Sequence, residues 1–322
     1  MEIDRLGKGE IAVDFFDLHC DTVSECVKAE KSLYRNDLHL DLKRGTEYHK
    51  WVQTFAFWMP DTLDEEAQYA LFQKELAAFR GFETDGDILI PYRGRAPMHK
   101  CSYLLAVEGA GLLGGRLDRL KELKQAGVSF LTLTWNGENR IAGGAGSNGT
   151  LTAFGAEVVR EAERQGIVID VSHLNRKSFW QVCNVARRPF IATHSNADKI
   201  CPHPRNLSGE QVKEIISRGG LIGLNLYPAF LSSEEDCKSS DFLRQIEYFL
   251  DAGAAECLAI GTDFDGAAMP KWINGIEGIE ILALSVVKWF GETIANQIFY
   301  GNAVRFCERV LFAAHETGCE SY

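Results

Sequence analysis

Short apolar segments alternate with amphipathic segments along most of the chain, and this alternation restricts the folds open to it. The apolar segments are rich in β-branched residues, as buried strands are; they cover residues 11–19, 50–58, 102–107, 128–134, 167–172, 189–193, 221–227 and 257–262. The amphipathic segments have helical spacing; they cover residues 65–82, 117–126, 154–165, 177–186, 209–218 and 241–252. Glycines that can end a helix follow four of them, at positions 127, 166, 219 and 253. Strands that alternate with helices predict a parallel sheet.

Eight strands are the number that closes a parallel sheet into a barrel. We therefore predict the α/β class, as a (β/α)8 TIM barrel with a single domain over residues 1–322. An open doubly wound sheet is the alternative, and the absence of a Gly-x-Gly-x-x-Gly turn after the first strand disfavours it. From about residue 277 onward, the pattern predicts two or three extra C-terminal helices packing outside the barrel.

The charge balance narrows the classes of partner. The formal net charge is -11, from 45 acidic and 34 basic side chains, so the surface repels phosphate backbones. For this reason we expect neither nucleic acid nor an anionic membrane as a partner. In addition, no apolar stretch nears the roughly 20 residues that span a bilayer. Nine cysteines without a Cys-x-x-Cys pair, and an N-terminus without an apolar signal, predict a cytoplasmic protein with reduced thiols. We also expect a small-molecule substrate, and a homodimer is one oligomeric state open to the chain.

Imidazoles and carboxylates stand at the C-terminal ends of five predicted strands. In a barrel those ends meet at one mouth, where active sites are built. The five strands end on His19 and Asp21, on Glu108, on His173, on His194, and on Asp263 and Asp265.

These residue types at this spacing predict a metal site. His19 and Asp21 are two residues apart on a strand, so both side chains project from one face and can hold one ion. His173 and His194 follow neighbouring strands and can hold a second ion, with Glu108 placed to bridge the two. Imidazole nitrogen and carboxylate oxygen suit zinc and similar divalent cations. Two such cations can share a hydroxide and stabilise the transition state of a hydrolysis.

The other polar residues receive a weaker interpretation. A single histidine at a strand end is most often a hydrogen-bonded structural residue, so the prediction depends on all five strands together. Asp17 and Asp170 are interpreted equally well as support for the ligands or as surface acids. Cys20 points away from its neighbours on the strand and is interpreted as packing. We assign no role to the remaining histidines, at positions 39, 49, 99, 203 and 315.

The chain resembles the renal (membrane) dipeptidases, zinc enzymes with an amidohydrolase-like barrel. The resemblance is carried, in the family's order, by Asp-Leu-His-Cys-Asp (17–21), Val-Glu-Gly (107–109), Leu-Thr-Leu-Thr (131–134), Ile-Asp-Val-Ser-His (169–173), Thr-His-Ser-Asn-Ala (193–197), His-Pro-Arg-Asn (203–206) and Ile-Gly-Thr-Asp-Phe-Asp-Gly (260–266).

The resemblance implies a binuclear zinc dipeptidase in which a metal-bridging hydroxide attacks the peptide carbonyl. It assigns His19 and Asp21 to one zinc, His173 and His194 to the other, and Glu108 to both. It further implies that Asp263 carries the catalytic proton and that Arg205 holds the C-terminal carboxylate of the substrate. Family members can accept a D-residue at that C-terminal position. The shorter reach from the strand end favours Asp263 over Asp265 for the proton.

The chain departs from the family pattern in the residues expected to contact the substrate. Trp135 stands where family members carry a histidine, and an indole cannot donate a proton as an acid would. The family's substrate-contacting tyrosine falls near Phe230, with Tyr227 close by. Two other functions therefore remain open: an amidohydrolase acting on N-acyl amino acids, lactams or esters, and a metal-binding barrel without catalysis.

Overall fold

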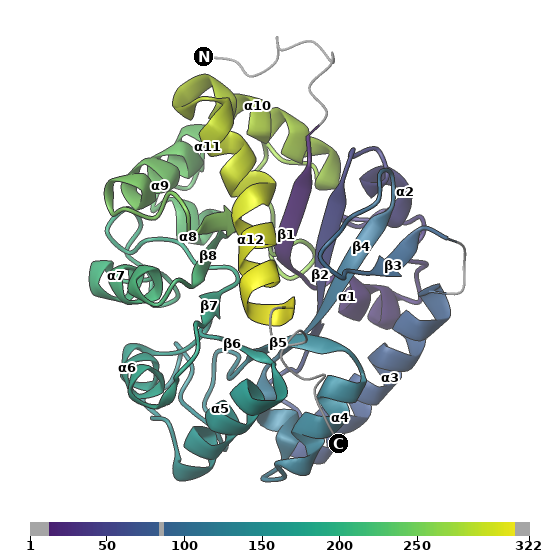
Figure 1. The fold of residues 1–322 in the computed structure, drawn as a ribbon, viewed down its shortest axis with the longest axis vertical. Helices are drawn as coiled ribbons and strands as arrows, with labels where there is room; N and C mark the ends of the chain where they lie inside the picture. Colours follow the sequence, from purple (N-terminus) through teal and green to yellow (C-terminus); the bar gives the residue numbers. More distant parts are fainter. Residues whose placement is uncertain (1–12, 84–86, 313–322) are drawn as a thin grey trace, which may run out of the picture.

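Eight parallel strands close into a barrel in the computed structural model, which describes residues 13–83 and 87–312 (Figure 1). The strands follow the order β2-β1-β9-β8-β7-β6-β5-β4, and a pairing between β2 and β4 closes the ring. Their bounds are β1 Phe15–Cys20, β2 Trp51–Trp58, β4 Cys101–Glu108, β5 Val128–Thr132, β6 Val168–Asp170, β7 Ile191–Ala192, β8 Leu221–Leu224 and β9 Leu258–Ile260. The predicted fold class is confirmed, and the open sheet is excluded.

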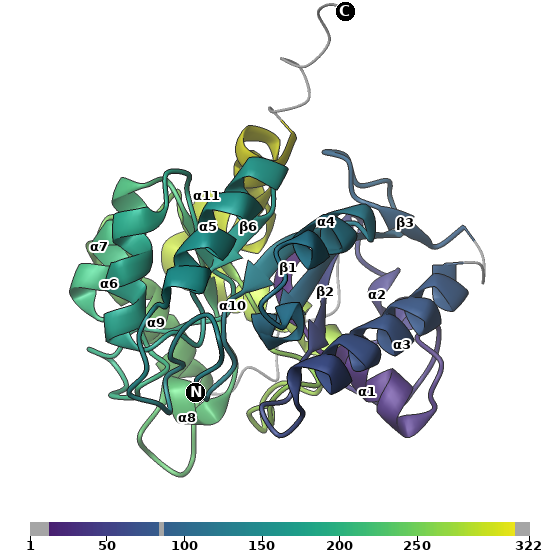
Figure 2. The same cartoon turned by 90° about the horizontal axis from the view of Figure 1, so that it is seen from below.

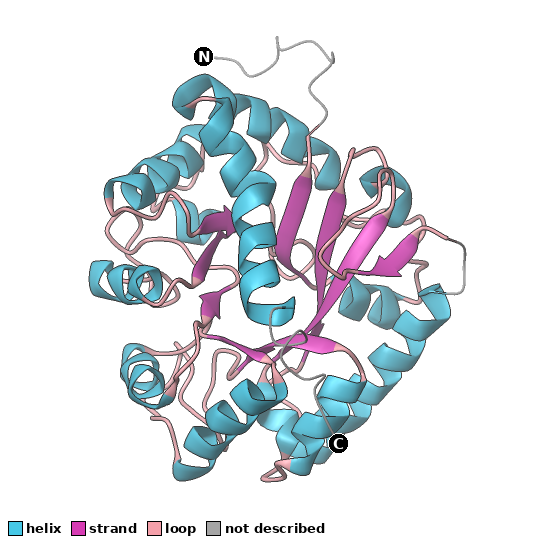
Figure 3. Ribbon diagram, viewed as in Figure 1, coloured by secondary structure: helices cyan, strands magenta, loops and turns pink. Residues whose placement is uncertain are grey.

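Helices surround the ring of strands (Figure 3). No helix in the described ranges is both long enough and apolar enough to cross a membrane. The helices are α1 Thr22–Ala29, α2 Leu42–Gly45, α3 Glu65–Glu83, α4 Asp118–Gln125, α5 Ala153–Gln165, α6 Arg176–Val185, α7 Gly209–Ser217, α8 Pro228–Leu231, α9 Ser239–Asp251, α10 Ile279–Phe290, α11 Glu292–Asn296 and α12 Asn302–Cys307.

Local sequence sets where these helices begin and end. The Thr152 side chain accepts a hydrogen bond from the Gly155 backbone at 2.9 Å, which caps the first turn of α5. Gly166 ends α5 in the left-handed conformation with φ 70°, where a side chain would be strained. The glycines predicted to end the other three helices also have positive φ.

A ninth strand was not predicted. β3 (Leu89–Pro91) pairs in parallel with the first three residues of β4, outside the ring. It has only three residues and ends in proline, so it shows neither a long apolar run nor an alternating pattern.

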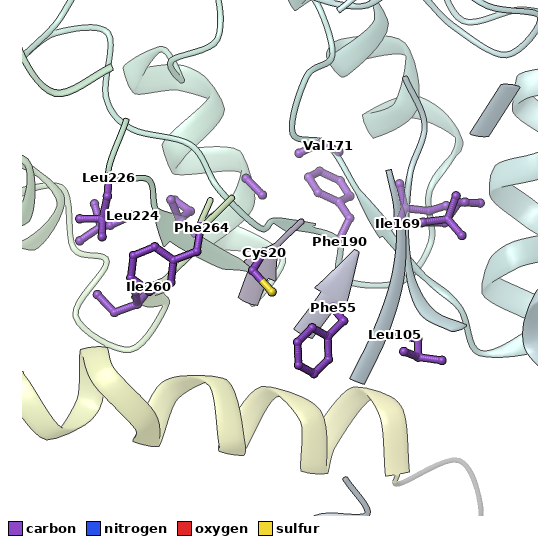
Figure 4. Packing of buried hydrophobic residues seen from close by; sticks show 14 of the residues in the cluster. Cys20, Phe55, Leu105, Ile169, Val171, Phe190, Leu224, Leu226, Ile260 and Phe264 are labelled. Atoms are coloured by element: carbon purple, nitrogen blue, oxygen red, sulfur yellow. The ribbon is translucent and has the colours of Figure 1, made fainter. Parts of the chain in front are cut away.

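Two apolar layers fill the molecule. The larger layer lies between the strands and the helices, and Figure 4 shows part of it, including Phe55, Leu105 and Ile260 from three strands. The smaller layer takes side chains from all eight barrel strands; it includes Phe16, Leu18, Val52, Ala56, Leu104, Ala106, Phe130, Val168, Ile191, Leu221 and Ala259. Unlike the larger layer, this cluster takes no side chain from α1–α11, which identifies it as the barrel interior. Cys20 belongs to the larger layer, as predicted, and the eight cysteines in the described ranges are buried and unpaired.

The C-terminal helical segment, residues 297–312 with α12 at its centre, lies across the N-terminal end of the barrel (Figure 1). Phe306 and Cys307 from α12 join the interior cluster, so the segment closes that end rather than packing only on the outer surface. Asn302 donates hydrogen bonds to the carbonyls of Ala255 and Leu258, at the start of β9. In Figure 2 this segment and α8 lie at opposite ends of the barrel. The C-terminal ends of the strands therefore remain free to form a site.

Candidate metal and substrate site

The structure brings the five predicted metal ligands and Asp263 together at the C-terminal mouth of the barrel. Each ligand comes from a strand end: His19 lies near the end of β1, Glu108 ends β4, and His194 follows β7 by two residues. Two of the gathered residues, His173 and Asp263, have left-handed backbones with φ 68° and φ 63°. Residues other than glycine seldom adopt this conformation, and strain of this kind concentrates at functional sites.

The two carboxylate oxygens of Glu108 face different groups of donors. Its Oε1 lies 2.6 Å from His173 Nε2 and 3.5 Å from His194 Nε2. Its Oε2 lies 3.6 Å from His19 Nε2, which is 3.2 Å from Asp21 Oδ2. Donor atoms of His19, Glu108 and His194 lie within 4.8 Å of one another, and so do those of His19, Asp21 and Asp263. His19 belongs to both of these groups, and Glu108 faces His173 and His194 through Oε1 and His19 through Oε2.

These donors fit divalent cations. The clustered side chains are buried, yet Asp21 Oδ1 has no hydrogen-bond partner among the described residues. An unpaired buried carboxylate oxygen is costly, so the arrangement favours a cation at this position. Burial and the charge of Glu108 both raise the pKa of the Asp21 carboxyl above its usual range. A cation between such carboxylates would relieve their repulsion.

Neighbouring polar side chains set the tautomer of two of the imidazoles. Thr193 Oγ1 donates its only proton to Asp170 at 2.6 Å, so it must accept a hydrogen bond from His194 Nδ1 at 2.8 Å. The proton of His194 is then on Nδ1, and its Nε2 keeps a lone pair directed at the cluster. His173 Nδ1 lies 3.0 Å from Asn136 Oδ1, an acceptor, which gives His173 the same tautomer.

The two aspartates whose interpretation was open are both buried supports. Asp170 accepts four hydrogen bonds, from the backbones of Ser172 and Thr193 and the hydroxyls of Thr132 and Thr193. Asp17 accepts hydrogen bonds from the Thr262 backbone and hydroxyl and from the side chain of Gln53. Both therefore order strand ends that carry site residues.

Asp263 and Asp265 differ in their surroundings. Asp263 Oδ1 lies 3.9 Å from His19 Nε2, and its Oδ2 accepts a hydrogen bond from Asn225 at 2.9 Å. Burial raises the pKa of the Asp263 carboxyl, and repulsion from Glu108 adds to the effect. Asp265 instead accepts hydrogen bonds from Thr22 Oγ1 at 2.6 Å and the His39 backbone at 2.7 Å. Of these two aspartates, Asp263 is the one that lies beside the donor clusters.

The buried Arg205 guanidinium forms no ion pair with any residue that the structure describes. Its side chain lines the same cavity as Glu108 and Asp263, and it is only 7% exposed. Its Nε and Nη1 atoms find no hydrogen-bond acceptor in the described ranges, while Nη2 donates to the His194 carbonyl at 3.5 Å. Burial lowers the pKa of the guanidinium to about 10, which still leaves it charged at neutral pH. The free donors can bind a carboxylate.

The remaining predicted substrate contacts, Trp135, Tyr227 and Phe230, line this cavity of about 670 Å³. Phe230 packs edge-on against Tyr227. The Arg205 guanidinium lies over the Phe230 ring, 5.4 Å from the ring centroid. The cavity also includes polar and aromatic side chains to which the sequence pattern assigned no role, among them Ser24, Glu25, Lys28, Trp58, Asn136 and His203. Trp58 is the last residue of a predicted strand, so the strand-end rule could have found it had it included aromatic side chains.

Comparisons with known proteins identify the family and the fold of the chain. The sequence model of the membrane dipeptidase family, peptidase family M19, matches residues 10–320. A metallopeptidase of Rhodobacter sphaeroides, solved with a phosphinate mimic of the dipeptide L-Ala-D-Ala, has the same fold: its TM-score is 0.85 at 22% identity, over 93% of this chain and 100% of that one.

Curated relatives include an uncharacterised protein of the pqqA 5′ region in Klebsiella pneumoniae. It is 32% identical over 219 residues, which are 63% of this chain and 80% of the relative. The dipeptidase aclJ of Aspergillus oryzae is 28% identical over 208 residues, 60% of this chain and 48% of aclJ. Because the family's sequence model spans nearly all of the chain, the chain belongs to the membrane dipeptidase family, peptidase family M19, and is a hydrolase.

Proposed function

We propose that this protein is a dipeptidase that holds two divalent cations, zinc in the first instance, at the mouth of its barrel. The observation that carries the proposal is the position of Glu108, whose two oxygens face separate groups of buried donors. In this proposal His19 and Asp21 hold one cation, His173 and His194 hold the other, and Glu108 contacts both. Two cations so placed supply an activated water and a Lewis acid for the peptide carbonyl.

The protein's own residues bind the substrate and move its proton. Arg205 holds the C-terminal carboxylate, because its buried Nε and Nη1 have no other acceptor among the described residues. Asp263 Oδ1 takes a proton from the attacking water and delivers it to the leaving amine, and its raised pKa suits both steps. Asn225 holds the other oxygen of Asp263, which fixes the carboxyl as the proton moves. The substrates include dipeptides with a C-terminal D-residue, a proposal supported by the L-Ala-D-Ala mimic in the Rhodobacter relative.

A substrate panel tests the proposal. Zinc-loaded protein is assayed with L,L and L,D dipeptides and with N-acyl amino acids of matched side chains, and bound metal is measured by mass spectrometry. We expect about two zinc ions per chain and turnover of dipeptides. Turnover of acyl amino acids alone would replace the dipeptidase with the amidohydrolase alternative. If the protein bound metal but hydrolysed neither class of substrate, the non-catalytic metal-binding barrel would be the remaining alternative.

A further inference from the structure

Two tryptophans flank Glu108 at the mouth of the barrel. Trp58 ends β2 and is the register partner of Glu108 in the neighbouring strand β4. Trp135 follows β5, whose Thr132 pairs with Glu108 from the other side. The two indoles pack edge-to-face with ring centroids 5.1 Å apart, and both line the site cavity. We refer to Trp58 and Trp135 together as the indole wall.

Within the indole wall, Trp58 lies across the barrel from the β7 end that Arg205 contacts, and Trp135 packs against Trp58 from β5, two strand pairings from β7. In the closed ring, β2 and β7 are separated by four strand pairings in either direction, so they are diametrically opposed. Arg205 is fixed to the end of β7 by its hydrogen bond to the His194 carbonyl. A substrate whose carboxylate rests on Arg205 and whose scissile carbonyl lies at the donor clusters must direct its other end toward the indole wall.

The chemistry of that side selects an apolar group. The indoles offer flat apolar surface, and aromatic rings gain further from edge-to-face contacts with them. Two of the charged residues that line the cavity pair with each other, since Lys28 Nζ lies 2.7 Å from Glu25 Oε1. A cavity of about 670 Å³ also exceeds what two small residues would fill.

We propose that the indole wall makes the enzyme selective for substrates with a large aromatic side chain on the acyl side of the scissile bond. The inference rests on the proposed function, since it takes Arg205 as the carboxylate site. Trp58 and Trp135 are then specificity residues, and Trp135 offers an apolar contact where the family resemblance implies a histidine. Fully burying a phenylalanine side chain favours binding roughly 10- to 100-fold over a side chain that buries nothing.

The test compares dipeptides that share a C-terminal alanine and carry Gly, Ala, Leu or Phe at the N-terminus. For the zinc-loaded wild type we expect kcat/KM for Phe-Ala to exceed that for Gly-Ala roughly 10- to 100-fold. Trp135→Ala and Trp58→Ala should reduce this ratio to within about threefold, chiefly by lowering kcat/KM for Phe-Ala. Trp135→Phe should keep most of the ratio. The matched control is Trp180→Ala, on α6 outside the cavity, which should leave the ratio unchanged.

A binding measurement separates this inference from the proposed function. Calorimetry with uncleavable reduced-amide analogues of Gly-Ala and Phe-Ala gives the preference without turnover. Hydrolysis with a flat N-terminal profile would overturn the inference and leave the dipeptidase standing. Tighter binding of the Phe analogue, lost in Trp135→Ala, but without hydrolysis of any dipeptide, would support the inference and reject the dipeptidase. Equal binding of both analogues with no hydrolysis would reject both.

Discussion

At the scale of single residues, one hydroxyl proton determines how His194 meets the site. Thr193 gives that proton to Asp170, so its oxygen can only accept from His194 Nδ1. The glycines at positions 223 and 261 allow this arrangement, because a Cβ at either one would overlap the Thr193 carbonyl oxygen. A neutral threonine thereby controls the lone pair of a proposed metal ligand.

Replacing that hydroxyl should weaken metal binding. Thr193→Val removes the acceptor for His194 Nδ1–H at nearly constant volume, and we expect zinc affinity to fall roughly 10- to 100-fold. Thr193→Ser keeps the hydroxyl and is the matched control. Competition with a chromophoric chelator measures the affinity of each protein. Equal affinities for the valine and serine variants would show that the hydroxyl does not orient the imidazole.

The proton carrier can be tested in the same way. Asp263→Asn keeps the size of the side chain and a partner for Asn225 but cannot exchange a proton. We expect a loss of transition-state stabilisation on the order of 3–5 kcal/mol in kcat/KM for a dipeptide. The zinc content of the variant, measured alongside, should match the wild type. Unchanged hydrolysis by a fully metal-loaded variant would remove Asp263 from the mechanism.

Arg205 permits a test with a change in the substrate as well as in the protein. Arg205→Met leaves the substrate carboxylate without its charge-assisted hydrogen bonds, which should raise KM roughly 10-fold or more. Dipeptide amides, which lack the carboxylate, should be poor substrates of the wild type and should be little affected by the substitution. Arg205→Lys should recover only part of the loss, because an ammonium lacks the planar pair of donors. An equal effect of Arg205→Met on acids and amides would contradict the assignment.

At the scale of elements, the sequence predicted a strand wherever its apolar run was long or was followed by an imidazole or a carboxylate. The imidazoles and carboxylates at the strand ends predicted the metal ligands, because their types signal chemistry. The neutral supports Asn136, Thr193 and Asn225 carry no such signal, since their role depends on contacts between strands that are distant in the sequence. α12 was predicted as a helix of the C-terminal region, but helical periodicity does not specify the end of the barrel on which it packs.

Helix α3 carries a buried acid that makes stability depend on pH. The Glu75 side chain is 3% exposed, and its Oε2 has no hydrogen-bond partner among the described residues. Burial, with a smaller contribution from the charge of Asp21, raises the pKa of Glu75 to about 8. Between the pKa of Glu75 in the unfolded chain and about pH 8, the folded state binds more protons than the unfolded state. The stability that this group contributes is therefore present at low pH and is lost as pH rises.

Glu75→Gln should remove this loss. We expect the variant to match the wild type near pH 5 and to exceed it near pH 8 by roughly 2–4 kcal/mol in free energy of unfolding. Denaturant unfolding of metal-free protein at several pH values measures the difference. Glu235→Gln, at an exposed position, is the control and should show no pH-dependent difference. If the free energies of unfolding of Glu75→Gln and the wild type differed by the same amount at all pH values, ionisation of buried Glu75 would not be the cause of the pH dependence.

At the scale of the whole molecule, ring closure is what creates the site. β1 and β4 are both neighbours of β2, although about eighty residues separate them in the chain, and this brings His19 to 3.6 Å from Glu108. The sequence predicted this convergence because eight parallel strands must direct all their C-terminal ends to one mouth. It did not predict that Trp58 would stand across the barrel from β7, since that depends on the order and register of the closed strands.

Because the donors come from strands all round the ring, metal binding should stabilise the entire barrel. A ligand that binds only the folded state adds about 1.4 kcal/mol per bound ion for each tenfold rise in its free concentration above Kd. With two zinc ions per chain, the unfolding free energy should therefore rise by about 2.7 kcal/mol per decade of buffered free zinc. Glu108→Ala removes the residue that links the two donor clusters, and we expect its slope to fall to one ion or fewer. Thermal unfolding in zinc buffers measures both slopes, with Glu235→Ala as the surface control. A wild-type slope that corresponds to one ion would reject the binuclear site, and no dependence on zinc would reject the metal site itself.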